Sequence, residues 1–483
     1  MSLVNIEPKS VFKYFEEISN IPRGSKNEKN ISDYLVSFAK KHSLEVYQDK
    51  KLNVIIRKSA SKGYENSKGV ILQGHMDMVC EKNSNTIHDF SKDPIKLKVV
   101  DNMLYADNTT LGADNGVAIA YALAILESNT IEHPPLEVVI TTEEEIGMGG
   151  AMALNPSLIK GKYLINIDSE EEGSLLVSCC GGAKTILTLP VKYEKVNSEY
   201  SNYSIIISGL NGGHSGMDII KQRANANKII GRILSILSNE NIDFYISDIN
   251  GGSKVNAIPR ECKCSISFKS SEYKVVSSII NDILQNLKKE YESVDDNMCI
   301  TIEENNFVEN VFSKESTKNI ISIISFIPNG IDTMSQFIEN LPQSSNNLGV
   351  ISTLNNTVVF ENALRSNISS LKQDILNRHK LIADTFNCDF IVNGDYPEWG
   401  YINESHLRNV FVESYKEMFN KEPIITAIHA GLECGILKEK MPHLDIISFG
   451  PDHFDVHSPN EHLSIPSTER MWNYLLDVLK RLK

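Results

Sequence analysis

The sequence predicts an α/β protein in which one domain is interrupted by a second, inserted domain. In the first third of the chain, short β-branched runs alternate with segments whose apolar residues recur at helical spacing. From residue 185 to about residue 395 the chain becomes rich in Ser, Asn and Lys, and from Trp399 the first pattern returns. We therefore expect a first domain built from residues 1–184 and 397–483, and an inserted domain built from residues 185–396.

The elements expected in the first domain follow the order typical of a mainly parallel sheet flanked by helices. Apolar residues recur at helical spacing in residues 11–18 and 31–42, and an apolar helix is expected from Asn115. After Trp399 the pattern predicts a helix over 404–419 and a closing helix from Thr468. The expected strands cover residues 54–57, 70–72, 136–141, 163–167 and 446–449.

Strands and amphipathic helices also alternate in the inserted domain, which predicts an α+β unit. The expected strands include residues 203–208 and 265–268. The expected helices include residues 219–237 and 275–287.

Composition and charge exclude several classes of protein. The chain has 483 residues, with 48 Lys and Arg against 62 Asp and Glu, and its net charge of −14 opposes the binding of nucleic acid. The longest apolar stretch, residues 116–126, is too short to span a bilayer. The first residues lack the features of a secretory signal, and none of the eight cysteines forms a C-x-x-C pair. We expect a cytoplasmic protein with reduced thiols that binds neither nucleic acid nor membrane.

Five short polar clusters lie beside apolar elements of the first domain. Each alone has an ordinary explanation, such as an N-cap for Asp114 or a surface loop for a histidine. Ligands of open α/β sheets bind beyond the carboxyl ends of the strands, where these clusters could converge. Two histidines and three carboxylates could then hold two zinc ions roughly 3.5–4 Å apart. The clusters contain His75 and Asp77; Asp114; Glu143 to Glu145; Asp168; and His453, His457 and His462.

The three adjacent glutamates, Glu143 to Glu145, follow a strongly apolar strand. Carboxylates placed there repel one another and lose hydration, and a bound cation would relieve that repulsion. One of them could bind a metal while its neighbour acts as a general base. A solvated acidic turn is the alternative interpretation.

Six motifs occur in one order along the chain: HMDM, GADNG, TTEEEIG, NIDSEEEG, GGHSG and HSPNEH. Together they resemble the zinc aminoacylase/carboxypeptidase superfamily of co-catalytic metallopeptidases. The segments FEEISNIPRGSKNEKNISDYL, SCCGGAK and HAGLECG favour the branch of bacterial aminoacyl-histidine dipeptidases, which are carnosinase-like Xaa-His dipeptidases. The resemblance covers essentially the whole chain and implies a catalytic domain interrupted by a lid and dimerisation domain, in a homodimer.

The resemblance also implies roles for residues of the catalytic domain. The family pattern of acid, Glu, Glu, any residue and Gly makes Glu144 the general base and Glu145 a ligand. Asp77 would orient His75. The implied ligands are His75 and Asp168 for one zinc, Glu145 and His457 for the other, and Asp114 as the bridge between them.

In the inserted domain the resemblance implies residues that contact the substrate. His214, in GGHSG, would stabilise the oxyanion, in some relatives from the partner subunit. Asn256 and Arg365 would contact the substrate, with Arg365 binding its terminal carboxylate. Gly431 would supply a backbone contact.

The activity implied is hydrolysis of Xaa-His dipeptides, including β-Ala-His, with two divalent ions. Zinc is the first expectation, and cobalt and manganese stay open because such ligand sets accept several metals. A tripeptidase, aminoacylase or carboxypeptidase with the same metal set is one alternative. A metal- or peptide-binding protein without activity is another, which a missing ligand or base would indicate; here every such position is filled.

Overall fold

The computed structural model describes residue 3 and residues 5–483, which separate into two units. Unit 1 comprises Met1–Ser178, Trp399–Ala427 and Leu432–Lys483. Unit 2 comprises Cys179–Glu398 together with Ile428–Gly431. The short return of the chain to unit 2 at Ile428–Gly431 has no counterpart in the boundaries expected from composition, because four residues leave no compositional signal.

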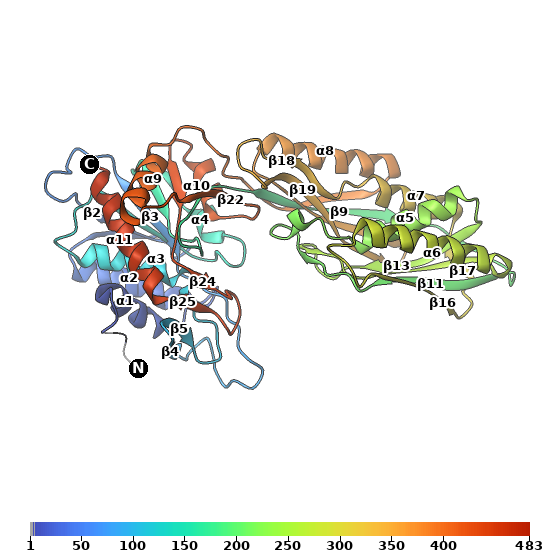
Figure 1. Cartoon of the computed structure of the whole chain (residues 1–483), viewed down its shortest axis with the longest axis horizontal. Helices are drawn as coiled ribbons and strands as arrows, with labels where there is room; N and C mark the ends of the chain where they lie inside the picture. The colour runs from blue at the N-terminus through green and yellow to red at the C-terminus, as the bar shows by residue number, and fades with distance from the viewer. Residues whose placement is uncertain (1–2, 4) are drawn as a thin grey trace. The chain divides into compact units, whose positions relative to one another are not determined.

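An eight-stranded mixed sheet lies at the centre of unit 1 (Figure 1). The four central strands, β6, β3, β7 and β23, run parallel, whereas β1, β2 and β8 pair antiparallel on either side. The predicted α/β class is confirmed, with three parallel pairings at the centre of the sheet. The strands in spatial order are β1 (Glu45–Gln48), β2 (Val54–Lys58), β6 (Leu136–Thr141), β3 (Val70–His75), β7 (Tyr163–Asn166), β23 (Asp445–Ser448), β8 (Ser174–Cys179) and β22 (Ile424–Ile428).

Helices cover this sheet because its central strands are apolar throughout. Every residue of β3, β6 and β7 is buried, as expected for strands with both faces covered. Helix α3 packs on β3 and on α1, while α9 packs on β23 and on α11. The helices are α1 (Lys9–Ser19), α2 (Lys29–Lys41), α3 (Ala113–Glu127), α4 (Gly149–Ala153), α9 (His406–Phe419), α10 (Glu433–Lys440) and α11 (Ile465–Arg481), with a short 3₁₀ turn at Pro156–Leu158.

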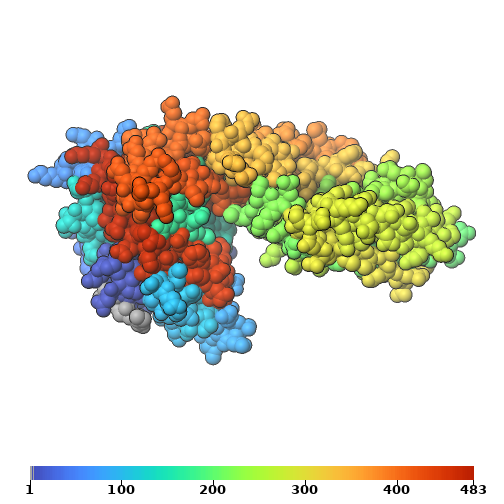
Figure 2. Space-filling model, viewed as in Figure 1, coloured from blue at the N-terminus to red at the C-terminus, as the bar shows by residue number. Residues whose placement is uncertain are grey.

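A smaller four-stranded sheet joins two distant parts of unit 1. Its strands are β24 (His453–Phe454), β25 (His462–Ser464), β5 (Met103–Ala106) and β4 (Leu97–Val100). The pairing of β25 with β5 places red and blue segments side by side in Figure 2. Together with the pairing of β24 and β25, this contact fixes both ends of the loop that contains His457.

Unit 2 is built on a nine-stranded antiparallel sheet with helices packed against it. The core between them includes Ile230, Leu234 and Phe268. The sheet order is β16 (Cys299–Asn305), β11 (Tyr200–Ser208), β15 (Cys262–Lys269), β13 (Phe244–Gly251), β19 (Pro342–Leu354), β20 (Thr357–Ser366), β9 (Gly181–Pro190) and β21 (Asp389–Tyr396), and β18 (Gly330–Met334) pairs with β19. The helices are α5 (Ala226–Asn239), α6 (Tyr273–Glu290), α7 (Lys314–Phe326) and α8 (Ser369–Phe386). The remaining short pieces are β10 (Tyr193–Lys195) with β17 (Asn310–Phe312), β12 (Gly213–His214) with β14 (Ala257–Ile258), and 3₁₀ turns at Ile219–Lys221 and Ser270–Glu272.

The helix predicted over 219–237 is wrong at its start. Residues Ile219–Lys221 form a 3₁₀ turn, and α5 begins only at Ala226. The Asn225 side chain accepts a hydrogen bond from the Lys228 N–H, so it caps the helix at this point. Among the described residues, no helix is both long and apolar enough to cross a bilayer.

Candidate metal centre

The five predicted metal ligands all lie in unit 1, at or near the carboxyl ends of its central strands. His75 is the last residue of β3, Asp168 follows β7, and Glu145 follows β6. Asp114 lies at the start of α3, and His457 lies between β24 and β25. Parallel strands end at the same edge of a sheet, so ligands distant in sequence meet there.

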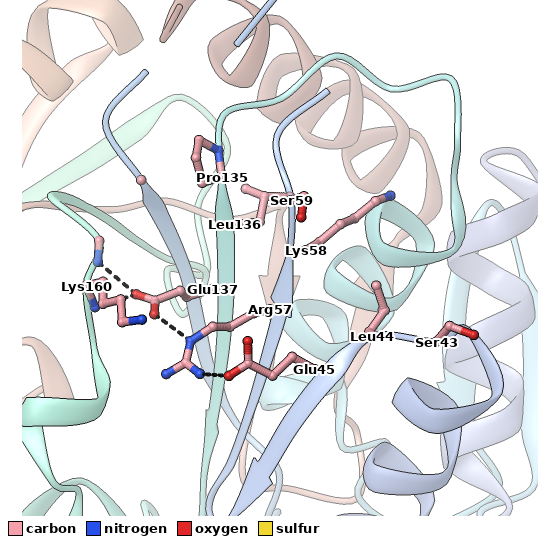
Figure 3. A pocket seen from close by; sticks show the side chains of 12 residues that line it. Ser43, Leu44, Glu45, Arg57, Lys58, Ser59, Pro135, Leu136, Glu137 and Lys160 are labelled. Carbon is pink, nitrogen blue, oxygen red and sulfur yellow. Dashed lines mark hydrogen bonds and ion pairs between the residues drawn. The ribbon is translucent and has the colours of Figure 1, made fainter. Parts of the chain in front are cut away.

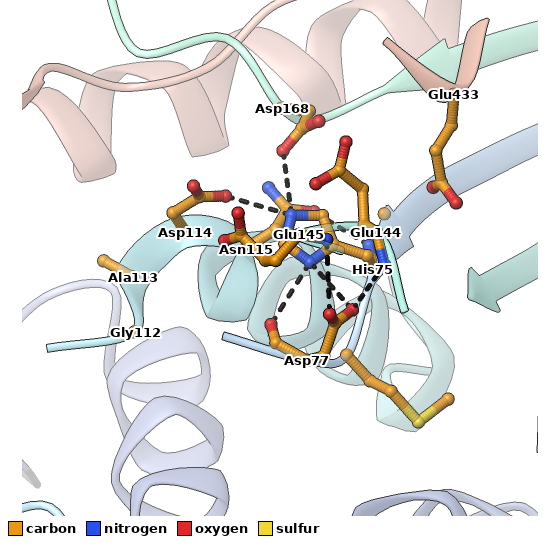
Figure 4. Close-up of polar contacts among 12 residues, drawn as sticks. His75, Asp77, Gly112, Ala113, Asp114, Asn115, Glu144, Glu145, Asp168 and Glu433 are labelled. Atoms are coloured by element: carbon orange, nitrogen blue, oxygen red, sulfur yellow. Dashed lines mark hydrogen bonds and ion pairs between the residues drawn. The ribbon is translucent and has the colours of Figure 1, made fainter. Parts of the chain in front are cut away.

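Asp114 lies between the two predicted histidine ligands. His75 Nε2 is 3.0 Å from Asp114 Oδ1, and His457 Nε2 is 3.0 Å from Asp114 Oδ2. His75 Nε2 is also 3.5 Å from Asp168 Oδ1, and His457 Nε2 is 3.1 Å from Glu145 Oε2. Figure 4 shows Asp114 and Asp168 directed at the His75 ring. The side chains therefore form two groups that share Asp114, each with its ligand atoms within 4.8 Å of one another.

Asp114 does not cap the helix that follows it. Its backbone and that of Asn115 are not helical, and no side-chain capping hydrogen bond forms at this end of α3. Asn115 instead accepts a hydrogen bond from the His75 N–H at 3.2 Å and donates one to the Ile167 carbonyl. Asn115, which sequence reasoning missed, thus connects the start of α3 to the chain around His75 and Asp168.

Asp77 contacts the second ring nitrogen of His75, Nδ1, through both its backbone carbonyl and its carboxylate. Its Oδ1 lies 3.4 Å from His75 Nδ1, and its carboxylate accepts hydrogen bonds from the Glu144 and Glu145 N–H groups at 3.0 and 3.3 Å. A carboxylate on Nδ1 leaves Nε2 directed at the cluster. Burial is the largest single influence on the pKa of Asp77 and would raise it, but the hydrogen bonds and the charge of His75 together outweigh burial and lower that pKa.

The three adjacent glutamates have different surroundings. Glu143 is held away from the cluster by Lys51, whose Nζ lies 3.0 Å from its carboxylate. Glu144 and Glu145 instead form a group with His75. Burial, together with the charges of Asp168 and Glu433, raises the pKa of Glu144 well above its usual range. A buried carboxyl group with a raised pKa holds a proton more readily than an ordinary glutamate, as a general base requires.

The pKa values of the histidines and carboxylates in the cluster are shifted by their contacts with one another and by burial. Hydrogen bonds with Asp114 and Glu145 raise the pKa of His457 to about 11. Burial would lower the pKa of His75, but hydrogen bonds with Asp114 and Asp168 raise it well above its usual range. Burial also raises the pKa of Glu145 and of Asp168, which reflects the cost of gathering these carboxylates.

Divalent metal ions suit this donor set. Neutral imidazole nitrogens and carboxylate oxygens are zinc ligands, and a cation can replace the protons that the histidines would otherwise hold. The cluster is also accessible from one side, because the His457 side chain is 49% exposed whereas that of His75 is 1% exposed. The residues present therefore fit two divalent ions that share Asp114.

Of the three histidines in the 453–462 stretch, only His457 contacts the cluster. His453 Nε2 lies 3.0 Å from Glu461 Oε1, and the His462 ring stacks on Tyr105 with ring centroids 4.7 Å apart. Sequence spacing did not distinguish among these histidines. It also missed Glu433, which accepts hydrogen bonds from Gln73 and Thr141, both at 2.6 Å.

The predicted substrate-contacting residues lie together within unit 2. The Asn256 carbonyl accepts a hydrogen bond from the Ser215 N–H, next to His214. A Cβ on Gly216 would lie 3.0 Å from Arg365 Nε and 3.1 Å from His214 Cε1.

Tyr396 and Gly431 complete this group. Arg365 Nη1 donates to the Tyr396 hydroxyl at 3.0 Å, and a Cβ on Gly431 would lie 2.7 Å from the Tyr396 ring. Arg365 Nε is buried and has no hydrogen-bond partner among the described residues. Arg365 thus carries one buried donor that no described residue satisfies.

His429 belongs to the same group and was missed by sequence reasoning, although HAGLECG drew attention to its neighbours. Its Nε2 lies 2.7 Å from Ser345 Oγ and its Nδ1 lies 3.0 Å from Cys180 Sγ. Burial lowers the pKa of His429 to about 3, so the ring is neutral at physiological pH.

An α/β sheet with imidazole and carboxylate groups gathered at its carboxyl edge is the architecture of a metal-dependent hydrolase. The chain belongs to peptidase family M20/M25/M40, whose model matches residues 71–481. The resemblance inferred from the sequence motifs and the prediction of a metallopeptidase are confirmed.

Two relatives match over nearly the full length. The cytosol non-specific dipeptidase of Escherichia coli (strain K12) is 35% identical over 99% of this chain and 99% of its own length. The crystal structure of aminoacylhistidine dipeptidase from Vibrio alginolyticus, also 35% identical, superposes with a TM-score of 0.95 and covers 100% of this chain and 98% of that one. Aminopeptidase PepT from Bacillus cereus has a TM-score of 0.57 at 16% identity, with 99% of each chain covered, which shows the shared fold alone.

Proposed function

We propose that this protein is a dipeptidase that hydrolyses Xaa-His dipeptides, including β-Ala-His, with two divalent metal ions. Zinc is the first candidate, and cobalt and manganese are alternatives. The observation that carries the proposal is the position of Asp114, whose two oxygens face His75 and His457. The names of the two relatives at 35% identity, both dipeptidases, support the substrate class.

The proposal assigns His75 and Asp168 to one ion, Glu145 and His457 to the other, and Asp114 to both. When bound, such ions lower the pKa of a shared water and polarise the carbonyl of the scissile amide. Asp77 keeps His75 Nε2 directed at the cluster through its contact with Nδ1.

In this proposal Glu144 acts as the general base and then as the general acid of the hydrolysis. Its carboxylate accepts a proton from the attacking water as the new C–O bond forms at the amide carbon. It then donates that proton to the amine nitrogen as the C–N bond breaks. The raised pKa of Glu144 suits a group that must accept a proton from water and then pass it on.

The group in unit 2 is assigned the substrate contacts. His214 stabilises the negative charge that develops on the carbonyl oxygen, and Arg365 binds the terminal carboxylate of the dipeptide. Asn256 and the backbone at Gly431 complete these contacts. The hydrogen bond from Arg365 to Tyr396 supports this assignment, since it restrains the guanidinium, whose Nε has no hydrogen-bond partner among the described residues.

The proposal extends to assembly and location. We assign unit 2 the roles of lid and dimerisation domain in a homodimer, and we place the protein in the cytoplasm. A dimer mass in analytical ultracentrifugation supports the first assignment, and a monomer mass at micromolar concentration rejects it.

The substrate assignment is tested by metal analysis of the purified protein together with a substrate panel. We expect about two divalent ions per chain and cleavage of β-Ala-His and α-aminoacyl-His dipeptides. Cleavage of Leu-Gly-Gly with resistance of both dipeptide classes would instead identify a tripeptidase. Cleavage of N-acetyl amino acids alone would identify an aminoacylase, and a fully metallated protein without any turnover would be a binding protein.

A further inference from the structure

The loop Leu111–Asp114 is held between two buried side chains of opposite charge. Glu461 Oε2 accepts hydrogen bonds from the Leu111 and Gly112 N–H groups at 2.6 and 3.0 Å, and Oε1 accepts one from the Ala113 N–H at 2.8 Å. Arg23 Nη2 donates to the Gly112 carbonyl. A carboxylate thus binds the amide groups of this loop while a guanidinium binds one of its carbonyls.

Arg23 also contacts the loop that follows β3. Its Nη1 donates to the Met76 and Asp77 carbonyls at 3.1 and 3.3 Å. The neighbouring Ser25 Oγ donates to Asp77 Oδ2 at 2.8 Å. One guanidinium therefore connects the backbone after His75 to the backbone before Asp114, which are the two ligands that meet at 3.0 Å.

Two glycines make room for the guanidinium. A Cβ on Gly112 would lie 2.7 Å from Arg23 Nη2, and a Cβ on Gly116 would lie 2.8 Å from the same atom. Gly112 also has a φ of 71°, in the left-handed region that favours glycine. The glycines of the LGADNG segment and the arginine of the IPRGS segment thus form one packed arrangement, although 89 residues separate Arg23 from Gly112.

Stability alone is a poor reason for burying these charges. Arg23 and Glu461 are each 2% exposed, and removing such groups from water is costly. Apolar residues of similar size often replace buried charges without loss of stability, but they could not hold a backbone loop by its amides and carbonyls. Metal ligands require placement to within about 0.5 Å, which a held loop provides.

We propose that Arg23 and Glu461 are positioning residues that fix the Asp114 loop so that its carboxylate faces both histidine ligands. This inference rests on the proposed metal-dependent function. His453 supports Glu461 from the other side, since its Nε2 lies 3.0 Å from Glu461 Oε1. Neither Arg23 nor Glu461 binds metal or substrate in this scheme.

The test compares Arg23→Met and Glu461→Gln with a matched control, Arg57→Met. Arg57 is also a well-bonded arginine of unit 1, with Nε 3.0 Å from Glu137 Oε1 and Nη2 2.5 Å from the Leu158 carbonyl. It lines a cavity of about 530 Å³ beside the start of β6 (Figure 3). The metal centre lies at the other end of that strand. Removing Arg57 removes comparable bonds without touching the Asp114 loop.

We expect Arg23→Met and Glu461→Gln to weaken the binding of Zn²⁺, measured by competition with a chromophoric chelator, by about 10- to 100-fold. Turnover of β-Ala-His at saturating Zn²⁺ should fall while its KM changes less than twofold. Arg23→Lys should not restore Zn²⁺ affinity or turnover. An ammonium group lacks the planar set of N–H donors with which the guanidinium binds the carbonyls of both loops. Arg57→Met should lower the thermal midpoint and leave both Zn²⁺ affinity and turnover as in the wild type.

Wild-type Zn²⁺ affinity and turnover in both folded variants would overturn the inference and leave the proposed function intact. A wild-type protein that binds two Zn²⁺ ions without cleaving dipeptides would overturn the proposed function, while weaker Zn²⁺ binding in the variants would still support the inference. Should Arg23→Met fail to fold, Glu461→Gln decides alone, because it retains the side-chain size and one acceptor oxygen.

Discussion

Asp114 Oδ2 lies 3.0 Å from His457 Nε2, although the two residues are 343 positions apart in the chain. The other oxygen of the same carboxylate lies 3.0 Å from His75 Nε2. One side chain therefore faces both halves of the cluster. An aspartate can bridge two cations because its oxygens are equivalent when ionised.

Asp114→Asn should remove this bridge, since an amide offers only one oxygen acceptor. We expect loss of at least one divalent ion per chain and a fall in turnover of more than about 100-fold. Elemental analysis after gel filtration and a β-Ala-His assay check both outcomes. Full metal content with normal turnover would refute the bridging role.

Glu144→Gln should abolish most of the activity without removing the metal. A glutamine cannot accept the proton of the attacking water, and general base catalysis typically contributes about 10²- to 10⁴-fold. Glu143→Gln is the matched control, because the adjacent Glu143 pairs with Lys51 and lies outside the cluster. Equal turnover in the two variants would argue against Glu144 as the base.

Arg365→Met should weaken recognition of the substrate carboxylate. Hydrogen bonds to charged groups contribute about 1.5–3 kcal/mol, which corresponds to a loss in kcat/KM of about 10- to 100-fold. The wild-type enzyme should prefer a dipeptide to the corresponding dipeptide amide, and the variant should lose that preference. The control is Arg378→Met, since Arg378 pairs with Asp332 at 2.7 Å and has no assigned role. A preference retained in Arg365→Met would exclude the assigned contact.

Two buried histidines of unit 2 should make the protein less stable in mild acid. Burial lowers the pKa of His379 to about 4 and that of His429 to about 3, against about 6.5 in an unfolded chain. At a pH between the folded and the unfolded pKa of each histidine, that histidine is protonated in the unfolded chain and neutral in the folded chain. The two histidines therefore do not reduce the free energy of unfolding above about pH 6.5. Below that pH the free energy of unfolding decreases, by about 1–2 kcal/mol per histidine at pH 5.

His379→Gln isolates one of these contributions. The decrease in unfolding free energy between pH 7.5 and pH 5, measured with urea, should be smaller in this variant than in the wild type. His443→Gln, at an exposed position, serves as the control and should keep the wild-type decrease. An unchanged pH dependence in His379→Gln would contradict a neutral buried ring.

The sequence allowed the fold class to be predicted because apolar strands and helices alternate clearly around β3, β6 and β7. Convergence of the polar clusters followed from the rule that parallel strands end at one edge. The antiparallel edges of the sheet could not be inferred in the same way, since strands such as β1 and β8 carry no directional signal.

Parts of the site escaped sequence reasoning for a different reason. Arg23 and Glu461 contact the backbone of distant loops, so no spacing of side chains indicates their partners. Residue spacing alone did not separate His457 from His453 and His462; the motif resemblance singled out His457, and the fold shows its ring facing Asp114. His429 lies in the short return of the chain to unit 2, which composition does not mark.

The central claim is that two divalent ions share Asp114, and anomalous diffraction from crystals grown with Zn²⁺ tests it most directly. We predict two peaks at the zinc absorption edge, roughly 3.5–4 Å apart. One should lie against His75 and Asp168, the other against Glu145 and His457, and both against Asp114. A single peak, or peaks away from Asp114, would contradict this account of the protein.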